Sequence, residues 1–285
     1  MEQNESQNSV TIVTVTYNSL EVLPNMLSSI NEGVPIIIID NCSEDIKSLR
    51  ALSKKHKADL IESKSNLGFG SACNLGALKS KTEYILFLNP DTLLNSNAIQ
   101  ALLKASCKYP KAAAMNPKIL NGDNSIYLKR RSHLLPRSKW LKRNLKRDTK
   151  VNILSGSALF VKKEFFEKAQ GFDENIFLFH EDDDLSIRLN NEYGPLIYIN
   201  DSIVKHYTGT SSIRSNKNTA FKAWHMGQSK IYTIKKHQIT FGKTLAVFHS
   251  FVKIFSPENL LSKRRFIKNY SFLKSILYAC IFKKK

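Results

Sequence analysis

The sequence lacks several features that mark common classes of protein. Its four cysteines are scattered and form no CxxC pair (Cys42, Cys73, Cys107 and Cys280). This spacing argues against a zinc site or a disulfide framework, and it fits a reducing cytosol. No apolar run reaches the roughly 18–20 residues that a membrane-spanning helix needs. The polar residues 1–9 do not resemble a secretory signal peptide, so we expect a polar N-terminal tail.

Glycine-rich phosphate-binding loops are also missing. The turn that follows the first expected strand contains no glycine. The pair Gly68-x-Gly70 lacks the third glycine of a dinucleotide-binding fingerprint and follows the wrong strand. A Walker A sequence is absent as well. The sequence therefore does not indicate a dinucleotide site of this kind or a P-loop.

Acidic residues are few, since 24 Asp and Glu stand against 43 Lys and Arg, for a net charge of +19. Residues 129–150 and 243–285 each hold ten basic residues and one acid, a net of +9 each, which leaves +1 elsewhere. A near-neutral body with two basic segments suits a phosphate-bearing partner, either an anionic membrane or a nucleic acid. Because residues 129–150 show no clear periodicity, we expect a long mobile loop there.

Short apolar runs alternate with helical segments in the first half of the chain. This rhythm predicts an α/β fold with a doubly wound, mostly parallel sheet. The expected strands are 10–16, 35–40, 58–62 and 84–88, and the expected helices between them are 20–31, 44–57 and 70–80. Further along the chain we expect helices at 95–108, 163–169 and 181–191, and strands at 112–120, 151–161 and 196–199.

Polar side chains follow each of the first four strands. They are Thr16 and Asn18, Asp40 and Asn41, Asn66 and Gly68, and Asp91. Ligands bind at the carboxyl edge of such sheets, so these ends predict a nucleotide-sized crevice. For Asp91 an alternative stays open, because Asp91 or Thr92 could instead cap the helix at 95–108.

Four acids, residues 181–184, open a predicted helix directly after an aromatic run. Acids at a helix start can simply favour the positive end of the helix dipole, and Asp184 can pair with Arg188. A carboxylate partly buried by the aromatic residues would instead be a candidate general base, and we favour this interpretation. His206 precedes a Gly/Ser/Thr segment, which favours a loop that closes over phosphates.

The motifs together resemble those of the inverting glycosyltransferases of family 2, which have the GT-A fold. The resemblance covers roughly residues 10–215, and its Asn-Pro-Asp form is most similar to the bacterial rhamnosyltransferase branch. The motif residues are Thr16-Tyr17-Asn18, Asp40-Asn41-x-Ser43, Asn66-x-Gly68-Phe69, Asn89-Pro90-Asp91, Ser155-Gly156, Gly171-Phe172-Asp173, Glu181-Asp182-x-Asp184-Leu185, Arg188 and His206.

The resemblance implies a role for each matching residue. It implies Asp182 as the catalytic base, and Asp91 with His206 as ligands of a divalent metal, Mn²⁺ or Mg²⁺. Asn89 replaces the first acid of the family's Asp-x-Asp motif, which lowers the charge of this site. The implied nucleotide-sugar residues are Thr16, Tyr17, Asn18, Asp40, Asn66, Gly68, Asn89 and Asp91. The implied acceptor or supporting residues are Gly156, Asp173, Glu181, Asp184 and Arg188.

The resemblance also implies the substrates and the organisation of the chain. The donor would be a nucleotide sugar, with dTDP-rhamnose favoured, and the acceptor a polyprenyl-diphosphate-linked saccharide of bacterial O-antigen, capsule or cell wall. Residues 10–120 would form a Rossmann-like nucleotide-sugar half and residues 151–215 an acceptor half. Three alternatives stay open: a galactosyl or other hexosyl donor with UDP or GDP, a non-catalytic nucleotide-sugar binder, and a nucleic-acid binder, which the missing motifs disfavour.

The remaining residues, 216–285, are expected to form a basic, helical C-terminal extension. Within 260–282, apolar side chains recur at helical spacing beside four basic residues, Lys263, Arg264, Arg265 and Lys268. This pattern is typical of an amphipathic helix on an anionic membrane, which would place the protein at the cytoplasmic, inner face of a bacterial membrane. A helix that packs on the body with a solvated basic face is the alternative.

Overall fold

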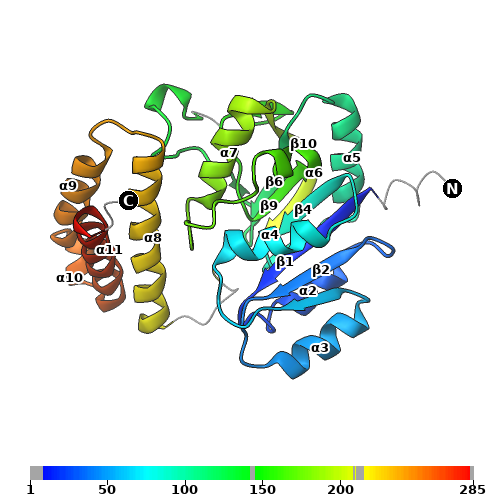
Figure 1. Cartoon of the computed structure of the whole chain (residues 1–285), viewed down its shortest axis with the longest axis horizontal. Coiled ribbons are helices and arrows are strands. Elements are labelled where there is room, and N and C mark those ends of the chain that lie inside the picture. Colours follow the sequence, from blue (N-terminus) through cyan, green and yellow to red (C-terminus); the bar gives the residue numbers. More distant parts are fainter. Residues whose placement is uncertain (1–8, 142–144, 208, 210–214, 283–285) are drawn as a thin grey trace.

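A computed structural model of the chain describes residues 9–141, 145–207, 209 and 215–282 (Figure 1). In this part of the chain ten strands form one sheet with the main order β3-β2-β1-β4-β9-β6-β10-β5. The strands are β1 (Val10–Thr16), β2 (Ile36–Asp40), β3 (Asp59–Glu62), β4 (Tyr84–Leu88), β5 (Thr92–Leu94), β6 (Ala114–Asn121), β7 (Ile126–Tyr127), β8 (Thr149–Val151), β9 (Ala158–Lys162) and β10 (Leu196–His206).

The helices cover both faces of this sheet and continue beyond it. The helices are α2 (Leu23–Ser28), α3 (Ile46–Lys55), α4 (Phe69–Lys79), α5 (Ala98–Lys108), α6 (Lys163–Lys168), α7 (Glu181–Glu192), α8 (Asn216–Lys236), α9 (Gly242–Ile254), α10 (Pro257–Leu260) and α11 (Lys263–Ile281), with a 3₁₀ turn at Arg137–Lys139. The helix expected at 20–31 is therefore shorter than predicted, since turns replace both of its ends.

The first four strands of the chain are parallel, as predicted. β1 lies between β2 and β4, and β3 pairs with β2 at the edge. In this register Thr16 stands opposite Asp40, so the strand ends meet at one edge of the sheet. All residues of β1 and β2 are buried because helices cover both faces, which explains their unbroken apolar sequences.

The second half of the sheet differs in detail from the prediction. β9 is antiparallel to both β4 and β6, whereas β10 is parallel to β6. The prediction of a single strand at 151–161 is wrong, since β8 and β9 are separate strands with a loop between them. The Asn116 side chain explains the break, because its amide donates to the carbonyls of Ser155 and Ala158 and its oxygen accepts from the Ser155 N–H.

The strand expected at 196–199 continues much further and ends at His206. After an irregularity between Ile199 and Ile203, β10 pairs with both β6 and β5, and His206 stands opposite Thr92. His206 therefore lies on a strand end, and the expectation of a loop position is wrong. The residues 208 and 210–214 of the expected closing loop lie outside the described residues. Thr92 begins β5 and does not cap α5, whose N-cap is Asn97.

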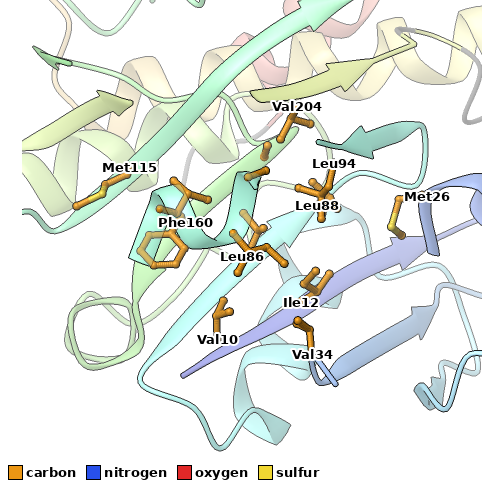
Figure 2. Packing of buried hydrophobic residues seen from close by; sticks show 14 of the residues in the cluster. Val10, Ile12, Met26, Val34, Leu86, Leu88, Leu94, Met115, Phe160 and Val204 are labelled. Atoms are coloured by element: carbon orange, nitrogen blue, oxygen red, sulfur yellow. The ribbon is translucent and has the colours of Figure 1, made fainter. Parts of the chain in front are cut away.

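Two apolar clusters sandwich the sheet. One contains Ile12, Leu86 and Phe160 and extends to residues of α2 and α5, as Figure 2 shows for its central side chains. The other contains Val13 and Phe87 and extends to residues of α4 and α7. Neighbouring residues of one strand thus enter opposite clusters, as the alternation of side chains along a strand requires.

In its described residues, the basic segment 129–150 is mostly loop, as expected, apart from the 3₁₀ turn and the start of β8, and several of these residues are held by contacts. Lys129 forms ion pairs with Asp182 and Asp183, and the side chains of Ser132 and Leu134 are buried. The Trp140 indole donates to the Ser132 and Leu135 carbonyls. Lys129 and His133 therefore attach this segment to the start of α7, while 142–144 lie outside the described residues.

The C-terminal helices form a group beside the sheet, with α8 between the sheet and helices α9 to α11 (Figure 1). A third apolar cluster joins α8 and α11 through Ile231, Ile234, Ile276 and Ala279. The helix expected within 260–282 is thus present as α11, and one of its faces packs on α8. None of the helices in the described ranges is long and apolar enough to cross a membrane.

The close contact between α4 and β1 gives a stability prediction. A Cβ atom at Gly76 would collide with the Val13 side chain, which is buried and stiff because it is β-branched. We expect Gly76→Ala to lower the free energy of unfolding by about 1–3 kcal/mol despite alanine's better helix propensity. Urea unfolding would measure the change, with Gly122→Ala as control because a Cβ there makes ordinary contacts. Wild-type stability in Gly76→Ala would contradict this packing.

Candidate active site

A cavity of about 390 Å³ opens at the carboxyl edge of the parallel strands. Its wall contains residues from the first strand-end loop, the 66–69 loop, the 155–157 loop and the start of α7. Many residues that the sequence singles out line it, among them Tyr17, Asn41, Asn66, Gly68, Asn89, Gly156, Glu181, Asp182 and His206. The topology therefore brings residues from distant parts of the chain to one hollow.

Asn41 holds the loop at 66–68 in place. Its Nδ2 donates to Asn66 Oδ1 (2.9 Å) and to the Gly68 carbonyl (3.1 Å), while its Oδ1 accepts from the Leu67 N–H. Gly68 has a φ of +83°, and a Cβ there would collide with the Phe177 carbonyl oxygen. The sequence analysis places Asn41 at a strand end but assigns it no role, and its full set of hydrogen bonds makes it a positioning residue.

Thr16, Asn18 and Asp40 lie next to the cavity without lining it. Both Asp40 oxygens accept from the Ser43 N–H (3.1 and 3.2 Å), and Asn18 Oδ1 accepts from the Glu44 N–H. Asp40 and Thr16 are almost fully buried. These contacts fasten the loops after β1 and β2 to each other, so that they form a rigid floor beside the cavity.

Asp91 and His206 approach each other at this edge. Asp91 Oδ1 lies 3.2 Å from His206 Nε2, and both side chains are nearly buried. Among the described residues, Asp91 Oδ1 and His206 Nδ1 have no hydrogen-bond partner. Adjacent ligands about 2.1 Å from an octahedral ion lie about 3 Å apart, so this separation and donor set fit a divalent metal.

Asp182, at the start of α7, is held by two neighbours. Its Oδ2 accepts from the Gly156 N–H (2.9 Å) and lies 2.6 Å from Lys129 Nζ. Gly156 permits this approach, since a Cβ there would lie only 3.2 Å from the Asp182 Cβ. Burial opposes the charge of Lys129, but the carboxylates of Asp182 and Asp183 outweigh it and raise the pKa of Lys129. Lys129 is thus a cation within the site that the sequence analysis misses.

Glu181 is an acid of this helix start whose pKa is raised. Burial, and then the negative charge of Asp182, raise the pKa of Glu181 well above its usual range. Its Oε2 is buried without a hydrogen-bond partner in the part of the chain that the structure describes. A carboxyl group in this state favours its protonated form, and it can donate a hydrogen bond into the cavity that it lines.

Asp173, Asp184 and Arg188 lie outside the cavity wall: Asp173 and Asp184 contact the end of α8, and Arg188 joins α7 to the 169–171 turn. Asp184 is fully buried and contacts Arg188 (2.8 Å), Lys236 (2.8 Å) and His237 (2.8 Å). Asp173 accepts from the Tyr232 hydroxyl and from Lys236. Burial opposes the charge on Asp173, but the hydrogen bonds from Lys236, Asn175 and Tyr232 together outweigh it and lower the pKa of Asp173 to about 2. These residues thus hold α7, which carries Asp182, in place.

A second group with metal-binding residue types lies behind Asp182. Ligand atoms of His133, His180 and Asp183 lie within 4.8 Å of one another. The two imidazole rings are 4.4 Å apart, and His133 Nε2 is 3.0 Å from Thr233 Oγ1. The nearby ammonium of Lys129 already neutralises Asp183, which disfavours a cation. Burial, and then repulsion from His180, lower the pKa of His133 to about 3.

Known proteins similar to this chain point to one family. The model for "Glycosyl transferase family 2" matches residues 11–169, more than half of the chain. An N-acetylglucosaminyl-diphospho-decaprenol L-rhamnosyltransferase of Mycobacterium tuberculosis is 28% identical over 260 residues, which cover 79% of this chain and 84% of the relative. Rhamnosyltransferase WbbL of Escherichia coli is 26% identical over 268 residues, or 84% of this chain and 99% of WbbL.

A solved structure agrees with the family at the level of the fold. GalNAc-T7, solved with UDP, GalNAc and Mn²⁺, superimposes with a TM-score of 0.62 at 15% sequence identity. The match covers 95% of this chain, which spans 57% of that protein. At this identity the likeness concerns the fold alone, and it assigns the GT-A architecture to the chain, as the sequence analysis predicts.

The buried His133 makes stability depend on pH. Its pKa is about 3 in the folded protein and near 6.5 when unfolded, so the unfolded chain binds more protons between these values. Stability should therefore fall as the pH drops below about 6.5. The wild type should lose free energy of unfolding between pH 7 and pH 5, and we expect His133→Gln to reduce this loss by about 1–2 kcal/mol, as measured by urea unfolding.

The exposed His249→Gln serves as the control, since it should leave the pH dependence of the wild type unchanged. An equal loss of stability on acidification in wild type and His133→Gln would show that His133 is not buried in its neutral form.

Proposed function

The chain belongs to glycosyl transferase family 2, and from this premise we propose that it moves L-rhamnose from dTDP-rhamnose to a polyprenyl-diphosphate-linked saccharide, with inversion. The observation that carries the proposal is the cavity with Asp182 in its wall and the buried pair Asp91 and His206 at the same strand edge. Similarity to two rhamnosyltransferases over 79% and 84% of the chain supports the choice of sugar.

On the donor side, the loops after β1, β2 and β3 bind the nucleotide. Tyr17 and Asn66 line the cavity, and Asp40 and Asn41 keep their loops rigid. Asp91 and His206 would hold Mn²⁺ or Mg²⁺, which when bound neutralises the charge that develops on the leaving diphosphate. Asn89 lies in the same wall and keeps the site less negative than a pair of carboxylates would.

On the acceptor side, Asp182 is the general base. As the acceptor oxygen forms its bond to the anomeric carbon, the bond from that carbon to the nucleoside diphosphate breaks, and the hydroxyl proton moves to the Asp182 carboxylate. The Gly156 N–H orients the carboxylate. The Lys129 ammonium lies 2.6 Å from Asp182 Oδ2. The acceptor hydroxyl must therefore displace this ammonium or give its proton to Oδ1 instead.

The proposed acceptor sets where the reaction takes place. One relative is named for a decaprenol-linked substrate, and a polyprenyl-diphosphate tail resides in a membrane. We therefore place the enzyme at the cytoplasmic, inner face of a bacterial membrane, in the synthesis of a surface polysaccharide such as O-antigen, capsule or cell wall. An anionic membrane surface and a nucleotide-sugar donor are then its partners, and nucleic acid is not.

The role of Asp182 can be tested by a single change. Asp182→Asn keeps the shape of the side chain but cannot accept the proton, so turnover should fall by about 10²–10⁴-fold. Nucleotide binding should persist, as isothermal titration with dTDP would show. Asp201→Asn, a change at an exposed carboxylate, is the matched control and should be fully active. Near-normal turnover in Asp182→Asn would rule out this residue as the base.

The donor can be identified by thermal stability. A ligand that binds only the folded protein stabilises it and so raises the unfolding temperature. At a ligand concentration of about a hundred times the dissociation constant, the free energy of unfolding rises by about 2.7 kcal/mol. We expect dTDP-rhamnose with Mn²⁺ or Mg²⁺ to give a larger shift than UDP- or GDP-sugars. A larger shift with a UDP- or GDP-sugar would replace rhamnose by another hexose, and no shift with any nucleotide would oppose the transferase proposal.

A further inference from the structure

Helices α9 and α11 expose a continuous series of large apolar side chains, here called the apolar face. On α9 they are Leu245, Phe248, Phe251 and Val252, with Phe255 directly after the helix end, and on α11 they are Phe266, Tyr270, Leu277 and Ile281. Phe248, Phe251 and Phe255 are 61%, 55% and 70% exposed, so water rather than protein surrounds most of each ring. Spacings of three and four residues place each set on one side of its helix.

The two helices contribute to the same surface. A shallow, apolar groove of about 540 Å³ runs between them. Val247, Phe248 and Phe251 form its α9 wall, and Leu273, Leu277 and Cys280 form its α11 wall. Phe248 and Phe251 of α9 therefore share one groove with Leu277 of α11, so the apolar faces of the two helices meet there.

The packing of the helices does not use this patch. α11 meets α8 through Ile276 and Ala279, which are buried on its other side, and α9 buries Ala246 and Ser250. Exposed apolar patches are costly in water and mark surfaces for another partner or for a membrane. One side of α11 is thus core, as in the packed alternative of the sequence analysis, while its other side exposes apolar residues and the predicted membrane contact stays a prediction.

Basic side chains accompany the apolar face. Lys243 lies at the groove, and Lys253, Lys263, Lys268 and Lys274 are exposed on the same two helices. Residues 243–285 carry a net charge of +9. Exposed apolar rings on helices that also expose lysines match an anionic bilayer, in which phosphates lie directly above hydrocarbon. A second copy of the chain would bring the same positive charge to this surface, and the repulsion disfavours it.

We propose that the apolar face is a docking surface for an anionic phospholipid bilayer, with Phe248 and Phe251 entering the boundary between headgroups and acyl chains. The inference rests on the proposed function only in that a lipid-linked acceptor gives docking a purpose. α8 joins this surface to the start of α7, so docking would hold the cavity at a fixed height above the acceptor's membrane.

The test is flotation of the full chain with vesicles, in the absence of any sugar substrate. We expect binding to vesicles of equal parts phosphatidylglycerol and phosphatidylcholine, with weaker binding to phosphatidylcholine alone and at high salt. Phe248→Glu should reduce the bound fraction at least about tenfold. Leu78→Glu is the matched control, because Leu78 is 74% exposed on α4, in the catalytic part of the chain, and should change nothing.

Three results would overturn the proposal. The first is that the wild type fails to float with anionic vesicles. The second is that Phe248→Glu and Leu78→Glu bind the vesicles equally. The third is that Phe248→Glu abolishes a dimer or an RNA complex while vesicle binding persists. Both variants alter exposed positions, and unchanged unfolding temperatures would verify that they fold. Since the vesicles contain no donor or acceptor, a negative result here leaves the nucleotide thermal shifts as an independent test of the transferase activity.

Discussion

The first turn of α7 contains four consecutive carboxyl groups, and the site depends on how each is compensated. Asp182 is held by Lys129 and the Gly156 N–H, and Asp184 by Arg188, Lys236 and His237. Buried carboxylates without such partners would be strongly destabilising. The partners come from the basic segment, the loop before β9 and the end of α8. A single helical turn therefore gathers three distant parts of the chain around the cavity.

Much of the parallel half of the sheet, strands β1 to β4, was predictable because the sequence patterns that mark these strands are local. Runs such as Ile36–Asp40 are buried on both faces and end in polar residues, which identifies both the strand and its carboxyl end. The second half depends on long-range pairing instead. β5 has only three residues, and it extends β10 to His206 by pairing with it. The sequence pattern of β10 alone does not reveal that β5 pairs with it. The end of β10 at His206 was therefore predicted as a loop.

Several residues that line the cavity were predictable from the sequence, but the contacts that support them were not. Asp182 and His206 follow from motifs, whereas Lys129 comes from a segment whose many charges suggest a solvated loop. Its acidic partners lie more than fifty residues away, so no spacing rule connects them. Asp173 and Arg188 belong to the same motifs as Asp182, yet they face α8 and the 169–171 turn. Motif membership alone did not separate residues that line the cavity from those that brace it.

The bond between the end of α8 and Asp184 bears on how this protein can evolve. Lys236 and His237 neutralise a carboxylate two positions after Asp182, so the C-terminal helices are part of the catalytic scaffold and not a removable appendage. Exchange of these helices for those of another enzyme would leave Asp184 without two of its three partners, unless Lys236 and His237 were retained. Variation in this region is therefore confined to its outer surface, while the inner face of α8 must change together with α7.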